Sequence, residues 1–182
     1  MATFVLIALT AGCKAFAPDF AEFGGSRMRD IRDRAALHDT MLTLRLDTLL
    51  PVLMERVGVD CWLILADGSE GDVLVSLLTV RATRLEGKGV LLLCNQDSAL
   101  ARIALGAGFS SNAAIYEVVE PSDDLALAGL LNDHLRAFKP ESIAVNDSLQ
   151  FPAADGLTAS NARWLRDYLV PEFSSRLISS RP

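Results

Sequence analysis

The feature that most constrains this chain is an amphipathic helix that ends at a glycine and leads straight into a buried strand. It occupies residues 41–66, MLTLRLDTLLPVLMERVGVDCWLILA. Apolar side chains recur there with a period near 3.6 residues, which places them along one face of a helix. The positions are Leu42, Leu46, Leu49, Leu50, Leu53 and Val57. Such a face must be covered by another layer of the protein.

Two residues are expected to shape this helix and its end. Pro51 has no amide proton and its ring crowds the carbonyl of Asp47, so the helix should kink or restart at the proline. Gly58 stands where a left-handed cap is needed, with Val59 as the hydrophobic partner of that cap. The apolar run at residues 61–66 is too short for a helix and suits a strand buried on both faces.

The rest of the chain is interpreted as layers added to that strand. We expect an apolar neighbour at residues 73–80 running antiparallel to the first strand, then a strand at residues 89–94. Further expected elements are a helix from a capping Ser98 to Leu105, a strand at 114–119, and a helix capped by Ser122 that ends near Phe138 and has Leu125 on its buried face. A strand at 142–146, a helix capped by Thr158 and a strand at 176–179 follow. The glycines of Gly106-Ala107-Gly108 are expected to end the helix before them. This order predicts an α/β domain with a mixed sheet flanked by helices.

Composition narrows the class of protein. The chain has 182 residues, of which 51% are hydrophobic and 22% charged, and this is enough to bury the core of one domain. Its net charge of -6 argues against a nucleic-acid partner, because such binding depends on clustered Lys and Arg. The arginines near the start of the helix alternate with Asp30 and Asp33, which is typical of a solvated helix face. No apolar run is long enough for a transmembrane helix.

The first 25 residues differ in character from residues 26–182 and are treated as a separate segment. An apolar run at residues 4–9 is followed by Thr10-Ala11-Gly12 and then Cys13. This pattern resembles a bacterial export signal with a lipoprotein box, in which Cys13 would carry the lipid. The alternative is an ordinary apolar segment packed on the domain. The first interpretation predicts a periplasmic or lipid-anchored protein and the second a cytoplasmic one.

The cysteines and histidines suggest no metal site. Cys61 and Cys94 lie at opposite ends of two apolar runs, and an intervening antiparallel strand would make those runs parallel and keep the thiols apart. We therefore expect no disulfide. His38 and His134 fall in helical patterns and are expected at the surface or its boundary. Three cysteines without a Cys-x-x-Cys spacing and two histidines give no cluster of metal ligands.

Two separated blocks of the sequence resemble the N-terminal domain of the creatinase, prolidase and aminopeptidase P family. The first block holds Arg45-Leu46-Asp47-Thr48, Leu50-Pro51, Leu53-Met54, Gly58, Asp60, Trp62 and Ala66. The second holds Ile143-Ala144-Val145-Asn146, Ala154-Asp155-Gly156-Leu157-Thr158 and Arg176-Leu177-Ile178-Ser179-Ser180. Two blocks in the same order and register make the resemblance more specific than either motif by itself.

The resemblance implies a ribonuclease H-like mixed sheet that usually precedes a pita-bread metallopeptidase domain. In that family two metal ions are held by aspartates, glutamates and a histidine of the second domain, so the resemblance assigns no catalytic residue, metal ligand or cofactor to these 182 residues. Exported relatives carry Arg-Glu-Tyr-Asn-Glu-Asp-Pro after the first strand. Here the corresponding loop retains only Asp72, and Glu70 and Asp72 are its candidate partner-facing residues.

Three hypotheses for function remain. The favoured one is a non-catalytic N-terminal-type domain that acts in assembly or shapes a partner's active site, as a homodimer or with a separate protein partner. The second is the N-terminal part of a genuine metal-dependent Xaa-Pro aminopeptidase. The third is a free-standing exported binding lipoprotein.

Overall fold

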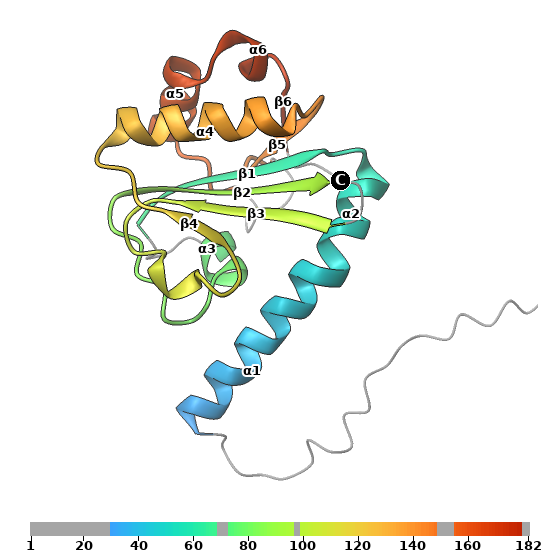
Figure 1. The fold of residues 1–182 in the computed structure, drawn as a ribbon, viewed down its shortest axis with the longest axis vertical. Helices are drawn as coiled ribbons and strands as arrows, with labels where there is room; N and C mark the ends of the chain where they lie inside the picture. The colour runs from blue at the N-terminus through green and yellow to red at the C-terminus, as the bar shows by residue number, and fades with distance from the viewer. Residues whose placement is uncertain (1–29, 69–72, 97–98, 149–154, 180–182) are drawn as a thin grey trace, which may run out of the picture.

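The computed structural model describes residues 30–68, 73–96, 99–148 and 155–179, which form one six-stranded mixed sheet with helices on both faces (Figure 1). The strands are β1 (Cys61–Asp67), β2 (Lys88–Gln96), β3 (Ala99–Leu105), β4 (Glu117–Val119), β5 (Ile143–Val145) and β6 (Leu177–Ser179). The helices are α1 (Ile31–Leu44), the π-helical turn η2 (Arg45–Leu49), α2 (Leu50–Val57), α3 (Val73–Leu78), the 3-10 turn η3 (Ser110–Asn112), α4 (Asp124–Phe138), α5 (Ala159–Tyr168) and α6 (Pro171–Ser174). The predicted α/β fold class is confirmed.

The strand order is β4-β3-β2-β1-β5-β6. Strands β1, β2 and β3 form an antiparallel meander, whereas β5 is parallel to β1 and β6 is parallel to β5. Strand β4 is parallel to β3 and is reached through the 3-10 turn η3, whereas the connections that lead to β5 and β6 pass through α-helices. An antiparallel meander continued by parallel strands beside β1 is the ribonuclease H-like arrangement that the resemblance implied.

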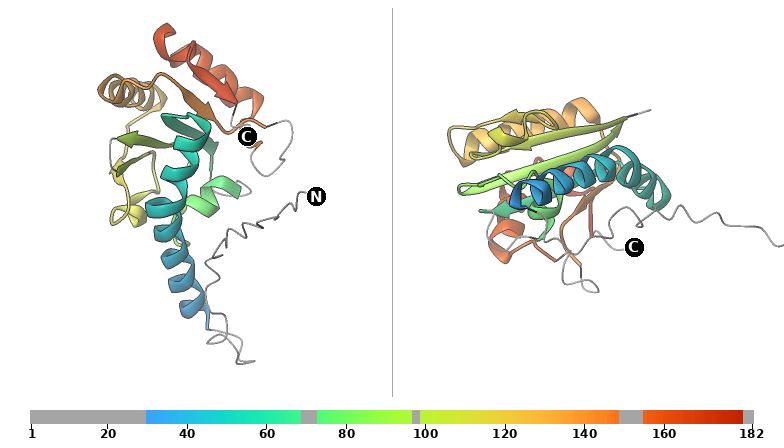
Figure 2. Two further views of the ribbon diagram at one scale, coloured as in Figure 1. Left: turned by 90° about the vertical axis from the view of Figure 1, so that its right-hand side faces the viewer. Right: turned by 90° about the horizontal axis from the view of Figure 1, so that it is seen from below.

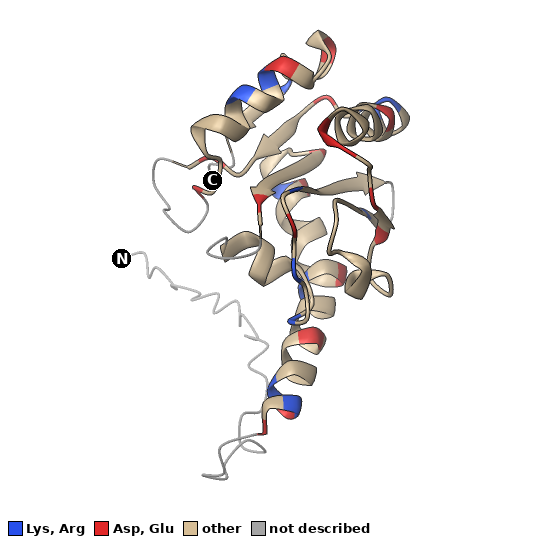
Figure 3. Cartoon of the chain, turned by 90° about the vertical axis from the view of Figure 1, so that its left-hand side faces the viewer, with Lys and Arg blue, Asp and Glu red and all other residues tan. Residues whose placement is uncertain are grey.

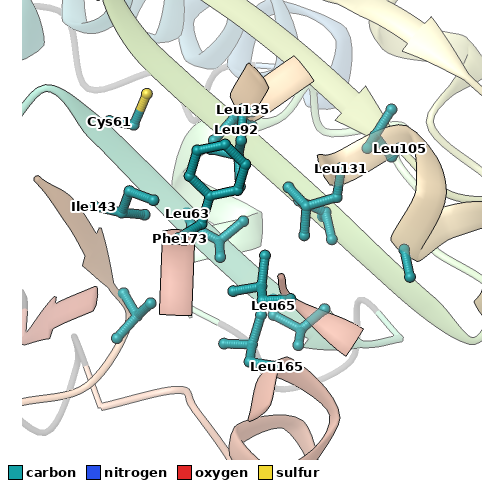
Figure 4. Packing of buried hydrophobic residues seen from close by; sticks show 14 of the residues in the cluster. Cys61, Leu63, Leu65, Leu92, Leu105, Leu131, Leu135, Ile143, Leu165 and Phe173 are labelled. Carbon is teal, nitrogen blue, oxygen red and sulfur yellow. The ribbon is translucent and has the colours of Figure 1, made fainter. Parts of the chain in front are cut away.

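Alternate residues of the central strands face two separate cores. Cys61, Leu63 and Leu65 of β1 face a core covered by α4, α5 and α6, which includes Leu131 and Phe173 (Figure 4). The intervening residues of β1 face a second core, covered by the chain from α1 to α3. Figure 2 shows α4 and the α1–α2 helix on opposite sides of the sheet. A strand buried on both faces explains the uninterrupted apolar run of β1.

The first helix is longer than predicted and changes its register before the proline. It begins at Ile31, where Asp30 accepts a hydrogen bond of 2.6 Å from the Ile31 amide. The turn η2 ends at Leu49, two residues before Pro51, which takes an early position in α2, so the expected restart at the proline is confirmed. One extra residue in η2 keeps the buried side chains four residues apart. They are Leu42, Leu46, Leu50 and Met54.

This register corrects part of the predicted apolar face. Leu49, Leu53 and Val57 were expected to be buried and are exposed. A uniform period of 3.6 residues would have turned all three toward the sheet, but the wider π-helical turn rotates them away from it. From this helix, the four buried side chains named above pack into the second core. Leu49, Leu53 and Val57 remain exposed to solvent.

The end of the helix is built as predicted. Gly58 has φ 68° and ψ 38°, in the left-handed region. The Val59 amide donates to the Met54 carbonyl at 2.9 Å and the Gly58 amide donates to the Glu55 carbonyl at 3.2 Å. These two bonds are the Schellman arrangement of a helix C-terminus. Val59 packs against the second core as the expected hydrophobic partner.

The prediction of no disulfide is wrong, because the strand expected between the two cysteines is the helix α3. With that strand removed, β1 and β2 are direct antiparallel neighbours and Cys61 faces Cys94. Their α carbons lie 4.1 Å apart, and the two sulfur atoms form a disulfide. Both cysteines are buried. The disulfide joins the two central strands of the sheet at one end of their ladder.

Three further expectations are corrected in the second half of the chain. Residues 99–105 form the strand β3 instead of a helix capped by Ser98, and Gly106 and Gly108 therefore follow a strand. Asp123, not Ser122, caps α4, because its carboxylate accepts from the Ala126 amide at 2.8 Å. Leu125 was placed on the buried face of α4 and is exposed.

Other predictions in this half are confirmed. Thr158 caps α5 by accepting from the Asn161 amide at 3.2 Å. Strands β4, β5 and β6 fall within the predicted ranges. His38 and His134 are both partly buried, at the boundary of the protein surface.

Candidate functional site

The residues singled out from the sequence lie outside the described residues. These are Cys13, Glu70 and Asp72. Asp67, which ends β1 and precedes the segment that holds Glu70 and Asp72, is described and belongs to a polar cluster at the carboxyl end of β1. That cluster and an exposed apolar surface on the first helix are the two features with functional potential.

The polar cluster is centred on the amine of Lys88 at the start of β2. Its Nζ donates to Asp67 Oδ1 at 2.7 Å and to Asn161 Oδ1 at 2.7 Å, and it lies 5.7 Å from the ring centre of Trp164. The Lys88 side chain is only 12% exposed, whereas Asp67 is 45% exposed. A buried ammonium group needs such partners, because burial without them would cost several kcal/mol.

Two buried asparagines complete the cluster. Asn146 receives a hydrogen bond from the Leu65 amide and donates to the Leu65 carbonyl, both at 3.3 Å. Asn161 donates to the same carbonyl at 3.4 Å. The cluster thus joins the ends of β1 and β5 to the first turn of α5, at the sheet edge where α/β proteins hold ligands.

Asn146 belongs to the second sequence block that was recognised. Neither Lys88 nor Asn161 was predicted to join it in one cluster. Their contact spans 73 residues of chain. The available signal was a lysine at the start of an otherwise apolar strand, which requires an anionic or polar partner.

The second feature is an apolar stripe on the outer side of the first helix. It consists of six exposed residues with fractional exposures from 38% to 54%, namely Leu37, Met41, Leu44, Leu49, Val52 and Leu53. We call this set the apolar stripe. Leu37, Met41 and Leu44 follow helical spacing, and the extra residue in η2 brings Leu49 and Val52 onto the same side.

Polar contacts of His38, Arg45 and Asp47 hold this helix against the protein. His38 Nε2 lies 3.2 Å from the Ser76 carbonyl oxygen, and Arg45 donates to the Leu77 carbonyl at 2.5 Å. Asp47 forms an ion pair with Arg102 of β3. Because these contacts orient the helix, the apolar stripe is presented to solvent in a fixed direction. Figure 1 shows α1 extending beyond the sheet.

Basic and acidic residues alternate along the free end of α1 (Figure 3). This pattern matches the solvated helix face that was predicted for the arginines near Asp30 and Asp33. The charged residues flank the start of the apolar stripe and do not interrupt it between Leu37 and Leu44.

Within the described ranges, His, Cys, Asp and Glu side chains form no group of three or more able to hold a metal ion. None of the helices in those ranges combines the length and the hydropathy that a membrane span requires.

Comparisons with known proteins identify the fold. A solved structure of an X-Pro aminopeptidase from Thermotoga maritima MSB8 superposes on 72% of this chain with a TM-score of 0.51 and 15% sequence identity. The chain shares its fold with part of an X-Pro aminopeptidase. An Xaa-Pro dipeptidase from Bacillus anthracis matches 80% of the chain with a TM-score of 0.44 and 12% identity. No protein-family model and no curated protein sequence matches the chain.

The aminopeptidase-like fold confirms what the two sequence blocks implied about structure. The chain spans about a third of the length of each matched protein, 32% of the aminopeptidase and 33% of the dipeptidase. At such low identity the likeness concerns the fold and assigns no substrate or catalytic residue.

Proposed function

We propose that this chain is a non-catalytic N-terminal-type domain of an Xaa-Pro aminopeptidase-like protein, and that it acts in assembly. The apolar stripe is the observation that carries the proposal. Six exposed aliphatic side chains along one oriented helix form a contiguous apolar surface, and such surfaces on soluble proteins mark interaction sites. The fold supports the family part of the proposal.

A second copy of the chain is the partner that we propose for the apolar stripe. A two-fold axis crossing the helix would bring the same stripe from both copies together, and such self-complementary contacts build most homodimers. The side chains of the apolar stripe are uncharged, so two copies of the stripe can pack together without charge repulsion. Contacts of Arg45 and Asp47 already hold the helix in place, so ordering it on association costs little conformational entropy.

The experiment compares variants by sedimentation velocity over a range of protein concentrations. Leu44→Glu and Leu49→Glu place charges in the middle of the stripe and should convert the dimer to a monomer. Leu125→Glu is the matched control, because Leu125 is also an exposed leucine on a helix but lies on α4, on the other face of the sheet. The control should remain dimeric with an unchanged melting midpoint, and circular dichroism should show that all three variants keep the fold.

A wild-type chain that stays monomeric at high concentration would refute self-association. If Leu125→Glu dissociates the dimer as strongly as Leu44→Glu, the interface lies elsewhere. The non-catalytic part of the proposal has its own test, since the purified chain should not cleave Xaa-Pro peptides with added manganese, cobalt or zinc. Metal-dependent cleavage that follows the folded protein through purification would favour a genuine aminopeptidase.

We also propose that the chain is exported to an oxidising compartment. The disulfide between Cys61 and Cys94 supports this, because structural disulfides form and persist outside the reducing cytoplasm. Expression in a bacterium that processes lipoproteins should yield a mature chain beginning at an acylated Cys13, and Cys13→Ala should leave the chain unprocessed. Recovery of an intact N-terminus with free Cys61 and Cys94 thiols from the cytoplasm would contradict export. A processed chain without self-association would instead favour the free-standing lipoprotein.

A further inference from the structure

A pocket of about 400 Å³ lies between α1, α3 and the turn that follows α3. Its lining residues are His38, Val75, Ser76, Thr79, Val80, Arg81, Thr83 and Arg84. Neither the fold resemblance nor the apolar stripe gives this pocket a role. Its volume falls in the range of small-molecule sites, roughly 300–1,000 Å³.

The lining of the pocket is cationic in a chain that carries a net charge of -6. It includes two guanidinium groups, one imidazole and three hydroxyl groups, and no carboxylate is among these described lining residues. The nearest acidic group in the hydrogen-bond network is Asp39. Its Oδ1 lies 3.3 Å from His38 Nδ1 and accepts from the Arg81 amide at 3.5 Å. Asp39 therefore contacts two residues of the pocket lining, through the His38 ring and the Arg81 amide, and is not itself part of that lining.

Both arginines retain donors for a ligand. Among the described residues, the Arg81 guanidinium makes no hydrogen bond or ion pair. Arg84 uses Nη1 to bond the Thr83 carbonyl at 2.8 Å and, more weakly, the Arg81 carbonyl at 3.5 Å. Since a guanidinium has five donors, most N–H groups of this pair are available.

The turn that carries the arginines is rigid. The Thr83 amide donates to the Val80 carbonyl at 3.0 Å and closes a β-turn. Buried Asn112 holds the turn from below, accepting from the Val80 amide at 2.9 Å and donating to Thr83 Oγ1 at 2.9 Å. A Cβ on Gly108 would lie 1.8 Å from the Arg84 carbonyl oxygen, so that backbone is tightly packed as well. Such preorganisation reduces the entropy cost of holding a ligand.

We infer that this pocket binds the phosphate group of a small phosphorylated molecule. Arginine forks match the oxygens of a phosphate in a bidentate geometry, and the binding is charge-assisted. Ser76 and His38 line the same space and can contact the organic part of the ligand, whereas the N–H groups of the two arginines bind the phosphate. The volume exceeds what a bare phosphate fills, so the ligand would carry an organic part.

The test is an NMR titration of the full chain at low ionic strength with inorganic phosphate, ribose 5-phosphate and ribose. Phosphate and ribose 5-phosphate should shift the amide resonances of Ser76, Arg81 and Thr83 in a saturable way, and ribose should not. Arg81→Gln and Arg84→Gln should each weaken binding at least tenfold. Arg166→Gln removes an exposed arginine of α5 outside the pocket and should leave the affinity unchanged.

Two further variants sharpen the result. Arg81→Lys keeps the charge without the fork and should bind less tightly than the wild type. Asp39→Asn removes the carboxylate at the rim and should strengthen binding. Absence of saturable shifts at these residues would overturn the inference. Equal weakening by Arg166→Gln would do so too, because it would show attraction to overall charge. All arginines changed here are exposed, so unaltered melting midpoints separate lost binding from lost folding.

Discussion

Replacing Gly58 by alanine isolates the cost of a left-handed backbone from every packing effect. Gly58 ends α2 at φ 68°, and a Cβ added to it would meet no atom within 4 Å. Gly129 in α4 is the matched control, because an added Cβ there also meets nothing within 4 Å, but its backbone is helical. The same methyl group is therefore added at two open positions that differ in φ.

The expected magnitudes follow from the two conformations. An L-residue in the left-handed region costs about 1–2 kcal/mol, partly offset by about 0.4–1 kcal/mol from a more restricted unfolded chain. Gly58→Ala should thus lower the free energy of unfolding by about 1 kcal/mol. Gly129→Ala should raise it by about 1 kcal/mol, since alanine is the better helix former. For a chain of this size the two variants should differ in melting midpoint by about 4–8 °C.

The assay is thermal and urea unfolding of both variants, together with Gly58→Asn. Asparagine tolerates the left-handed region better than alanine, so Gly58→Asn should fall between Gly58→Ala and the wild type. Equal midpoints for Gly58→Ala and Gly129→Ala would refute the reasoning, because they would mean that the sign of φ does not determine the cost at Gly58.

Two more predictions concern the core. The Cys61–Cys94 disulfide closes a separation of 33 residues, so Cys61→Ala should lower the free energy of unfolding by about 3–4 kcal/mol in urea titrations. In the urea-unfolded chain, where burial no longer protects them, Cys61 and Cys94 should react with maleimide only after a reductant is added. Labelling of both cysteines in the unfolded chain without reductant would contradict the disulfide. Burial raises the pKa of Tyr116 well above its ordinary value near 10, against a smaller opposing effect of Arg102, and the hydroxyl donates to the Leu78 carbonyl at 2.5 Å. The unfolded state releases this proton first, so stability should fall as the pH rises above about 10. Tyr116→Phe should show a smaller fall when unfolding is followed from pH 8 to pH 11, and an identical fall would contradict this assignment.

The candidate site could be predicted from the sequence only in part. Asn146 lay in a recognised block, but no local pattern joins it to Lys88 and Asn161, which come from β2 and α5. Their association depends on how β1 pairs with β2 and β5. The apolar stripe was hidden for a different reason. A period of 3.6 residues cannot distinguish a row of leucines facing the sheet from one facing solvent when a π-helical turn shifts the register between them.

The sequence by itself determined the central unit of the fold. An apolar helical period, a proline, a glycine with a following valine and a short apolar run are local signals, and each acts through the backbone of a few neighbouring residues. The helix restart at Pro51, the left-handed Gly58 and the doubly buried β1 followed from them. Tertiary structure decided which short apolar runs became strands. Residues 73–78 became a helix and residues 99–105 a strand, because such runs satisfy either period and the choice depends on which neighbour supplies hydrogen bonds and covers the apolar face. That choice made β2 the partner of β1 and brought Cys61 opposite Cys94.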